Sequence, residues 1–596
     1  MTGRPRTAQE LIHWLEAGGG ARWVLLASLL SCSLVVSVVV SWRQFHGAAS
    51  ESTLVQADIG RSLAYGRGFS TKVIYPQAEA YLAGRGVRFD AAVAYPDVYQ
   101  APLYPLAIAA AIDAARLLPG PIRPDLFGPA PAPPYGFAAD YLLLALNVGL
   151  FWATVLLGFL LGRALFGVPA GWLSAAAIFV SLPLWQQVVA VNGSALMMAL
   201  SMAAFLAWWH AEMSGSPRGS AAAFAVLGAL CGALFLTEYS AGVLVLVAGG
   251  ACALERRPGR ALRIGLVAAG FAVVALPWVI REVAVTGLPT GLALQNVALK
   301  AGDTTAEPST CRATLSAALP QLDLTKLANK VLTSVQGALR SGIWSDGAMW
   351  FAALFATGCL YVFRSPQVNR LRWILAVSVA ALALAQAAFN SGESERQALV
   401  WMAPLIIVFG AGFFHVLLAS NPSLSSWPRL CAAVLVALQA GPLVHDALEP
   451  HWLHFQYPPY FPQLLQGMRS QLARADPDSR YGLMADIPAG LAWYGNTRVW
   501  AQPATLRDFY AVQVEQPTGE LLLTPRTLDR PFFTDLSAKS AASGFLTASM
   551  PKFGDWGEVY GGLLTGNFPS QFPLPVSRKV TEDLVVLING SLIGPR

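Results

Sequence analysis

Charged residues are scarce in this chain of 596 residues. Asp, Glu, Lys and Arg together make up 12% of it, about half of the ~25% usual in soluble globular proteins. Hydrophobic residues reach 55%, and the mean hydropathy is +0.50. This balance excludes a soluble enzyme, a disordered protein and a fibrous protein, and it predicts a polytopic membrane protein.

Several familiar signatures are also missing. The chain contains no P-loop, dinucleotide fingerprint, HExxH or GxSxG sequence, so nothing supports a soluble nucleotide-dependent enzyme or a metalloprotease. Five of its 6 cysteines lie in or beside apolar runs, which predicts neither a disulfide framework nor a metal cluster. The net charge of +6 does not indicate nucleic-acid binding, because the basic residues form short clusters between apolar runs.

Long apolar runs are what the sequence does contain. A bilayer core requires about 20 apolar residues of helix, because no water is available there to satisfy backbone groups. The first run is longer than the ~7–15-residue apolar part of a signal peptide, so we expect a retained anchor. About eleven transmembrane helices are predicted, at residues 22–42, 141–162, 168–186, 194–211, 220–237, 239–254, 264–280, 347–363, 373–390, 397–419 and 430–445.

The topology depends on residues 102–118. Asp113 and Arg116 leave this segment only a short uncharged run, and Pro105 weakens its start. If it does not cross, a cytoplasmic N-terminus puts ten arginines of the short loops inside and only Arg396 outside, as the positive-inside rule requires. A crossing segment inverts this bias unless the N-terminus lies outside. We therefore expect an interfacial helix along the outer leaflet.

Three regions then face outward. They are a first loop at 43–138, a second loop at 282–346 and a tail at 449–596, while residues 1–448 form the membrane domain. The tail alternates strand-like runs (GELLLTP, DLVVLING) with a helix-compatible stretch. Because Pro and Gly separate these pieces, the tail is predicted to be a small α/β domain on the outer, periplasmic side.

An acidic residue follows the first predicted span closely. In ADIGRSLAYGRGFS (57–70), a helix starting near Thr53 puts Asp58 and Arg61 on one face, and Gly66 helps to end it. An aspartate just above the outer leaflet could act as a general base on an incoming hydroxyl. The alternative interpretation is a solvated Asp58–Arg61 helix pair.

Several short motifs follow one another in a recognisable order: ADIGRSLAYGRGFS (57–70), YQAPLYPLAIAA (99–110), LGRALFGVPAGWLSAAAIFVSLP (161–183), LPWVIREVAVTGLP (276–289) and ERQALVWMAPL (395–405). Their order and their position relative to the spans resemble the GT-C superfamily of membrane glycosyltransferases. Within it, the closest resemblance is to family 39, the protein O-mannosyltransferase-like and aminoarabinose-transferase-like branch.

The resemblance implies a GT-C-like fold with interfacial helices in the first outer loop. It also implies transfer of a hexosyl or pentosyl group, with inversion, from a polyprenyl-phosphate carrier to a hydroxyl acceptor (a lipid, glycan or protein). The reaction would take place at the outer face of a bacterial inner membrane. No cofactor is required with certainty, and a divalent cation stays open. A surface-polysaccharide polymerase or ligase is one alternative. A lipid-sugar flippase is another, although it requires ionisable residues near mid-membrane, which the spans nearly lack.

The resemblance gives Asp58 the role of catalytic base or acceptor-orienting group, since it matches the family's first-loop acid. A phosphate leaving group needs charge stabilisation more than protonation, so cations at outer helix ends are candidates for binding the donor. Arg281 and Arg396 hold such positions, and Arg61 shares the helix face of Asp58. The alternative for each helix-end arginine is an interfacial anchor.

Three glutamates, Glu238, Glu393 and Glu395, also lie at predicted outer helix ends. Each could bind a sugar hydroxyl or a divalent cation, and the alternative is plain solvation in a loop. Two positions depart from the family pattern. Gln100 stands where some relatives have a lysine, and Asn192 lies where many have a second acidic residue, which puts a metal held by an acidic pair in doubt.

The tail segment MADIPAGLAWYGNTRVWAQP (484–503) resembles a stretch found in the tails of some bacterial family 39 proteins. Asp486, Trp493 and Tyr494 could line a surface on which a sugar stacks. The ordinary interpretation is a strand–turn–helix core with an aromatic anchor.

Overall fold

The structure is a computed structural model. It describes residues 20–48, 50–87, 95–119, 125–129, 136–254, 259–298, 312–341, 347–389, 395–421, 426–449, 462–524, 527–528, 556–581 and 584–592.

Long apolar helices dominate the first three quarters of the chain. Among the described residues, eight have the length and composition to cross a membrane, and each coincides with a predicted span. They are α2 (Gly20–Gln44), α6 (Ala138–Phe166), α9 (Ser194–Met213), α10 (Pro217–Thr237), α12 (Arg260–Thr286), α16 (Pro366–Phe389), α17 (Glu395–Ser420) and α18 (Pro428–Leu448). The protein is therefore a polytopic helical membrane protein.

The remaining three predicted spans differ from a simple helix. The run at 168–186 forms α7 (Val168–Phe179) and α8 (Leu182–Val189), which are bent by 55° where they meet. Residues 239–254 form a 3-10 turn, η2 (Tyr239–Gly242), followed by the short α11 (Val243–Leu254). The run at 347–363 yields only the short α15 (Trp350–Leu360). The apolar runs thus predicted where all three segments lie, but none of the three is a single long helix.

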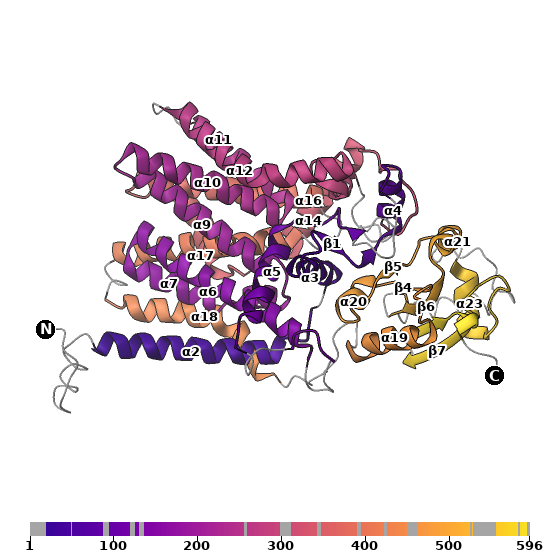
Figure 1. The fold of residues 1–596 in the computed structure, drawn as a ribbon. Coiled ribbons are helices and arrows are strands. Elements are labelled where there is room, and N and C mark those ends of the chain that lie inside the picture. Colours follow the sequence, from indigo (N-terminus) through magenta and orange to yellow (C-terminus); the bar gives the residue numbers. More distant parts are fainter. Residues whose placement is uncertain are drawn as a thin grey trace.

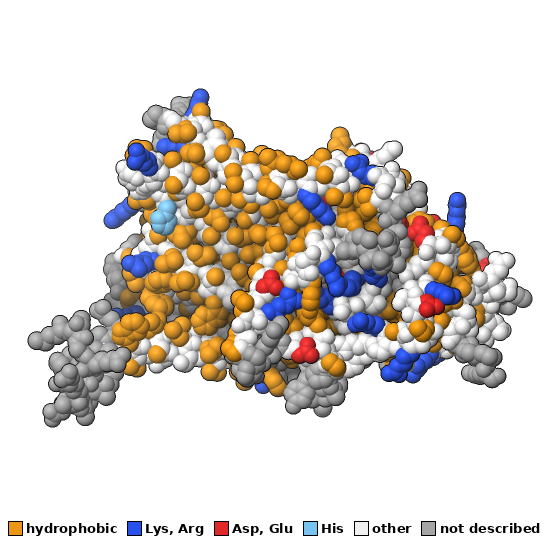
Figure 2. Space-filling view, viewed as in Figure 1, with side chains coloured by type: hydrophobic (Ala, Val, Ile, Leu, Met, Phe, Trp, Pro, Cys, Tyr) orange, Lys and Arg blue, Asp and Glu red, His pale blue; other side chains and the backbone are white. Residues whose placement is uncertain are grey.

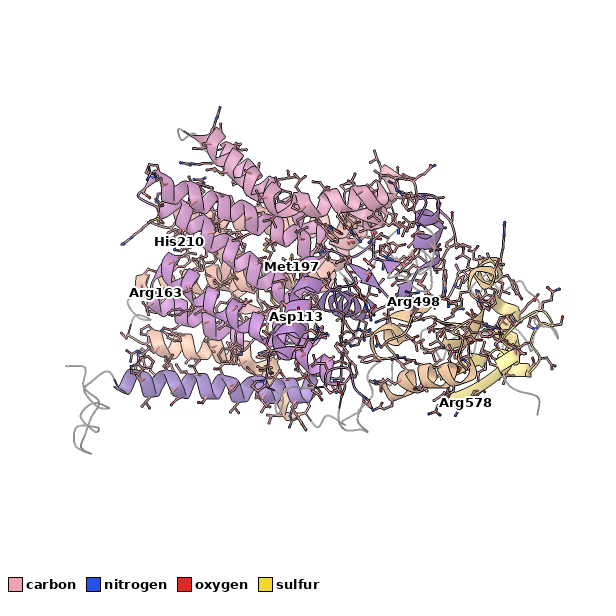
Figure 3. The ribbon with its side chains drawn as sticks, in the orientation of Figure 1. Asp113, Arg163, Met197, His210, Arg498 and Arg578 are labelled. Carbon is pink, nitrogen blue, oxygen red and sulfur yellow. The ribbon has the colours of Figure 1, made fainter. Side chains whose placement is uncertain are left out.

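The long helices run side by side, and the loops collect at their two ends (Figure 1). Arg163 and His210 lie at one end, whereas Arg498 and Arg578 lie beyond the other, in the C-terminal part (Figure 3). Figure 2 shows a largely hydrophobic face between these ends, as expected for a surface in contact with lipid. We call the end that carries the C-terminal part the outer end, although the sidedness itself stays a prediction.

The first loop folds against the outer end. It contains α3 (Glu51–Ala64), β1 (Ser70–Thr71), β2 (Val73–Ile74), α4 (Pro76–Ala83), β3 (Tyr95–Pro96) and α5 (Leu103–Arg116). The hydroxyl of Ser50 caps α3 by accepting the N–H of Thr53, and Gly66 adopts a positive φ just beyond its end. The helix predicted near Thr53 is therefore present.

The segment that decided the predicted topology is α5. It has 14 residues, fewer than the ~20 that a crossing requires. It packs closely on α3, because a Cβ added at Gly60 would lie 2.6 Å from Cγ2 of Ile108. Asp113 and Arg116 form an ion pair at 3.0 Å. These features agree with an interfacial position, which stays a prediction.

The second loop contributes η3 (Gly291–Ala298) and α14 (Leu324–Ser341). The tail forms the predicted α/β domain, with α19 (Pro462–Ala475), β4 (Gly482–Ala485), α20 (Pro488–Trp493), β5 (Val499–Ala501), α21 (Leu506–Glu515), β6 (Thr518–Leu523), α23 (Gly557–Thr565), β7 (Val576–Thr581) and β8 (Leu584–Ile588).

The sheet of the tail includes a strand from the first loop. Its order is β2-β5-β4-β6-β8-β7, with parallel pairing from β2 to β6 and antiparallel pairing through β8 and β7. Val73 of the loop pairs with Val499 of the tail, and side chains of both segments share one hydrophobic core. The division of the chain at residue 448 stays a prediction, but the tail does not build its core alone.

Small residues let α10 and α12 approach each other. A Cβ on Gly228 would lie 2.1 Å from the carbonyl oxygen of Val267, and one on Gly270 would lie 2.1 Å from that of Ala225. Close backbone contact of this kind is a common way for membrane helices to associate.

This contact predicts the effect of a single methyl group. Gly228→Ala should destabilise the detergent-solubilised protein by about 1–3 kcal/mol, because the backbones must separate. Gly265→Ala on α12 is the matched control, since no atom lies within 4 Å of its added Cβ, and it gains the same helix propensity of about 1 kcal/mol. Thermal unfolding measures both. Equal midpoints for the two variants would contradict the packing described.

Candidate functional site

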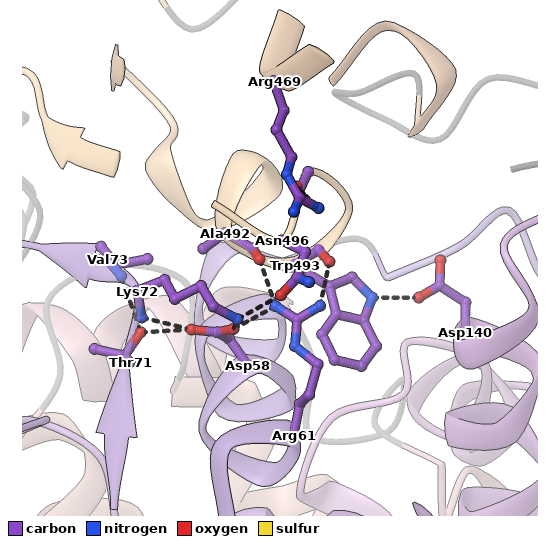
Figure 4. A network of polar contacts seen from close by, with 11 residues as sticks. Asp58, Arg61, Thr71, Lys72, Val73, Asp140, Arg469, Ala492, Trp493 and Asn496 are labelled. Carbon is purple, nitrogen blue, oxygen red and sulfur yellow. Dashed lines mark hydrogen bonds and ion pairs between the residues drawn. The ribbon is translucent and has the colours of Figure 1, made fainter. Parts of the chain in front are cut away.

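Asp58 lies on α3 with no exposed surface. Its Oδ2 accepts the backbone N–H of Lys72 at 2.7 Å and the hydroxyl of Thr71 at 3.1 Å. Its Oδ1 accepts Nη2 of Arg61 at 2.5 Å and lies 3.5 Å from Nζ of Lys72. The Asp58–Arg61 pair suggested by the spacing is therefore present, but it is buried rather than solvated. Figure 4 shows this arrangement, which we call the Asp58 network.

Arg61 extends the Asp58 network to the C-terminal domain. Its Nη1 donates to the carbonyl of Trp493 at 2.8 Å, and its Nη2 donates to the carbonyl of Ala492 at 2.5 Å. The guanidinium also lies 5.2 Å from the ring centre of Phe127 and 5.0 Å from that of Trp493, within reach of cation–π attraction. One side chain thus ties α3 to the end of α20.

Lys72 is the other cation of the Asp58 network. Its Nζ donates to Oδ1 of Asn496 at 2.6 Å, and its side chain is 14% exposed. Burial lowers the pKa of Lys72 to about 8, against the opposing attraction of Asp58. Burial alone would raise the pKa of Asp58, but the charges of Lys72 and Arg61 outweigh it and hold that pKa below its usual range. Asp58 is therefore an ionised carboxylate with its charge compensated.

The aromatic pair of the tail motif is an anchor. The indole N–H of Trp493 and the hydroxyl of Tyr494 each donate to a different carboxylate oxygen of Asp140, both at 2.8 Å. Asp140 lies in the first turn of α6. Both rings are buried, which leaves no face on which a sugar can stack. Asp486, the third residue of the motif, accepts the N–H and hydroxyl of Thr524 and so holds the end of β6.

Arg281 forms a second group of charges near the outer end of α12. Its Nη1 donates to the carbonyl of Asp97 at 2.9 Å and pairs with Glu282, and its Nη2 donates to the carbonyl of Phe69 at 3.3 Å. The guanidinium lies 4.9 Å from the ring centre of Trp278. Its side chain remains 25% exposed, so the charge is oriented by the protein and still accessible.

The turn at Asp97 brings Gln100 to this group. Oδ1 of Asp97 accepts the N–H of Tyr99 at 3.0 Å and that of Gln100 at 2.7 Å. Burial raises the pKa of Asp97 despite these bonds. The position where some relatives have a lysine is thus occupied by a neutral amide, and Arg281 and Arg312 are cations near this turn.

Glu238 is linked to the same group only through its chain neighbour. Tyr239 donates its hydroxyl to the carbonyl of Gln100 at 3.2 Å and accepts the indole N–H of Trp278 at 2.9 Å. The ring of Trp278 in turn contacts the guanidinium of Arg281. Burial raises the pKa of Glu238 to about 7, and we find no hydrogen bond or ion pair to its carboxyl group among the described residues. We call Asp97, Gln100, Tyr239, Trp278, Arg281 and Glu282 the Arg281 cluster, and Glu238 directly precedes its member Tyr239 in the chain.

Strand β1 connects the two groups. The carbonyl of Phe69, directly before β1, accepts Arg281, while Thr71 and Lys72 bind Asp58. Three predicted site residues therefore lie in two adjacent groups at the outer end, with Asp58 and Arg61 in one and Arg281 in the other, while Glu238 is the chain neighbour of Tyr239 in the second group.

The other predicted positions contribute less. Arg396 lies in the first turn of α17, but its side chain is outside the described residues, as are the side chain of Glu395 and the whole of Glu393. Asn192 accepts the N–H of Ser194 at 3.0 Å and shapes the turn before α9. Within the described ranges, no three His, Cys, Asp or Glu side chains are grouped as metal ligands.

Lys330 was not predicted. It lies on α14 with its side chain buried, and its Nζ donates to the carbonyls of Asn296 at 2.7 Å and Ala388 at 2.9 Å. Burial lowers its pKa to about 8. A buried lysine whose described partners are backbone carbonyls is unusual. The amphipathic sequence of α14 does not indicate which of its lysines is buried. Asp97 could have been found, because an aspartate that binds the N–H two residues on is a common turn signal.

Comparison with solved structures identifies the fold. The oligosaccharyltransferase of Archaeoglobus fulgidus in complex with Zn and sulfate is 11% identical, over 85% of this chain and 69% of that one, with a TM-score of 0.52. The archaeal oligosaccharyltransferase AglB from Archaeoglobus fulgidus, in complex with an inhibitory peptide and a dolichol-phosphate, is 11% identical over 85% of this chain and 70% of that one, with a TM-score of 0.52. ArnT from Cupriavidus metallidurans, bound to undecaprenyl phosphate, is 12% identical over 97% of this chain and 100% of that one, with a TM-score of 0.48.

The chain therefore shares the fold of the archaeal oligosaccharyltransferase, which agrees with the GT-C-like fold that its motifs predicted. The assignment rests on the archaeal enzyme, and the family 39 branch stays a prediction. No protein-family model and no curated protein matches the sequence.

The burial of Arg61 predicts a large loss of stability on its removal. Arg61→Gln leaves Asp58 with one cation fewer and the carbonyls at 492–493 with a weaker donor, and breaking a buried pair in this way costs about 3–5 kcal/mol. Thermal unfolding of the purified protein measures it. Arg67→Gln, an exposed arginine of the same loop, is the control and should change the midpoint little. Similar midpoints for the two variants would show that the network does not join the loop to the tail.

Proposed function

We propose that this protein transfers a sugar, with inversion, from a polyprenyl-phosphate carrier to a hydroxyl acceptor at the outer end of its helices. The observation that carries this proposal is the Arg281 cluster, where an accessible guanidinium is held in place by carbonyls of the first loop and by the ring of Trp278. The GT-C fold supports it, because the archaeal enzyme of the same fold has been solved with a dolichol-phosphate.

Arg281 suits the phosphate of the donor. When the bond between the sugar C1 and the phosphate oxygen breaks, both electrons stay on the phosphate, whose added charge needs a fixed cation nearby. The contacts of Arg281 to the carbonyls of Asp97 and Phe69 hold its guanidinium in place before the substrate arrives. Arginine also matches phosphate with two parallel hydrogen bonds. In this role Arg281 replaces the lysine that is missing at position 100.

Glu238 is suited to take the proton from the acceptor hydroxyl. As the acceptor oxygen bonds to C1, its proton must leave, and a carboxylate with a pKa near the working pH takes it most effectively. Burial gives Glu238 a pKa of about 7, whereas the carboxylate of Asp58 already accepts from Lys72, Thr71 and Arg61. We therefore assign the proton to Glu238. The base role that the resemblance implies for Asp58 stays a prediction, and its contacts suit a residue that positions Lys72 and Arg61.

The setting of the reaction follows the predicted topology. We propose that the outer end faces the periplasm of a bacterial cell, with the N-terminus in the cytoplasm, and that residues 449–596 form the periplasmic domain. The donor then reaches Arg281 from the outer leaflet. The hydroxyl acceptor then reaches Glu238 from the periplasmic side.

The first test is transfer from a panel of polyprenyl-phosphate sugars into membranes that contain the protein. Arg281→Gln should lower kcat by about 10²–10³-fold, the loss seen when one donor to a developing anion is removed. Arg260→Gln at the opposite end of the same helix is the control and should leave transfer unchanged. No transfer from any donor by the native protein, or full activity of Arg281→Gln, would refute the proposal.

The second test uses pH. Because the base must be ionised, kcat/KM of the native protein should rise as the pH increases through about 7, the pKa of Glu238. Glu238→Gln should be slow and should lose this rising limb. Glu520→Gln is the matched control, because Glu520 is buried in the C-terminal sheet with a pKa also raised to about 7. A rising limb that survives in Glu238→Gln would assign the proton to another group.

A further inference from the structure

A cavity of about 490 Å³ lies at the end of the helices opposite to the Arg281 cluster. The ends of α6 and α17, the start of α16 and the link between α15 and α16 enclose it. Its lining includes Phe166, Tyr361, Arg364, Ser365, His415 and Ser420. The volume is in the range of ~300–1,000 Å³ typical of small-ligand sites. None of the functions proposed above uses this cavity.

The lining has the chemistry of an anion site. Arg364 and His415 contribute two basic groups, and three hydroxyls come from Tyr361, Ser365 and Ser420. None of the residues that line the cavity is acidic. Neither Arg364 nor His415 has a hydrogen-bond or ion-pair partner among the described residues, so both are available to a ligand. A guanidinium without an acidic residue in the same lining favours a ligand with negative charge.

The backbone adds to this preference. The 24-residue helix α16 begins at Pro366, directly after Ser365 of the lining, and the N-terminal end of a helix carries partial positive charge. The hydroxyls of Ser365 and Ser420 already donate within the protein, to Oε1 of Gln367 and to the carbonyl of Leu417. The arginine, the hydroxyl of Tyr361 and the helix start remain, and such groups commonly bind phosphate oxygens.

The surroundings indicate where such a phosphate comes from. Leu360 and Val362, which flank Tyr361, are 86% and 78% exposed, as expected for side chains that face acyl chains. The positive-inside rule puts this end at the cytoplasmic leaflet, where basic pockets between helices bind lipid head groups. We propose that the cavity binds the phosphate group of an anionic ligand, with an anionic phospholipid head group as its source and the acyl chains lying along α15.

The experiment uses the full chain in detergent and three probes: phosphatidylglycerol, phosphatidylcholine and inorganic phosphate. Phosphatidylglycerol should raise the unfolding midpoint and should stay bound in native mass spectra, while phosphatidylcholine should do neither. Arg364→Gln should weaken phosphatidylglycerol binding at least tenfold. Ser420→Asp, which adds a negative charge to the cavity, should have the same effect. Arg260→Gln, an exposed arginine at the same end, is the control and should bind normally.

The outcomes separate the sources. Binding of phosphatidylglycerol alone identifies a lipid head group, and equal stabilisation by inorganic phosphate at the same concentration identifies a site open to soluble phosphate. Both results support the phosphate site. No response to either anionic probe, or an undiminished response in both cavity variants, overturns it. Sugar transfer is not part of this readout, so failure here leaves the proposed function untouched.

Discussion

The burial of one guanidinium organises the outer end of the molecule. Arg61 is held by the carboxylate of Asp58, by two carbonyls of the C-terminal domain and by two aromatic rings. Taking charges out of water is costly unless they are paired and hydrogen-bonded, and Arg61 has these partners only while the first loop and the tail stay together. The ion pair therefore specifies an arrangement more than it adds stability, and a polar substitute could not satisfy the same carbonyls.

The same logic extends from Arg61 to the proposed reaction centre. Asp58 fixes the backbone of Lys72, the residue directly after β1, so the end of β1 has a defined place. The residue before β1, Phe69, offers its carbonyl to Arg281. A cation that must meet a phosphate is thus oriented by a loop whose own position depends on the tail. This chain of contacts gives the C-terminal domain a physical reason to be present in a protein whose chemistry is proposed to occur at the membrane surface.

The sequence predicted those parts of the fold that follow from one-dimensional rules. Apolar runs located the spans because a bilayer permits few alternatives to a helix, and the i,i+3 spacing predicted the contact of Asp58 with Arg61. The contacts of Lys72 with Asp58 and of Val73 with Val499 could not be predicted, because they join segments 14 and 426 residues apart in the chain. The burial of Lys330 could not be predicted either. Its partners are backbone carbonyls, which every residue has, so the sequence does not indicate them.

The environments of two carboxyl groups at the outer end shift their pKa values in opposite directions, and this difference in pKa distinguishes their roles. Asp58 is surrounded by donors and cations, so its pKa lies below the usual range and a proton gains little by binding there. Glu238 is partly buried without a described partner, and desolvation raises its pKa to about 7. A group that must accept a proton and later release it works best when its two forms are close in free energy. By that criterion the first-loop aspartate is suited to hold the site together, and the glutamate at the end of α10 is suited to react.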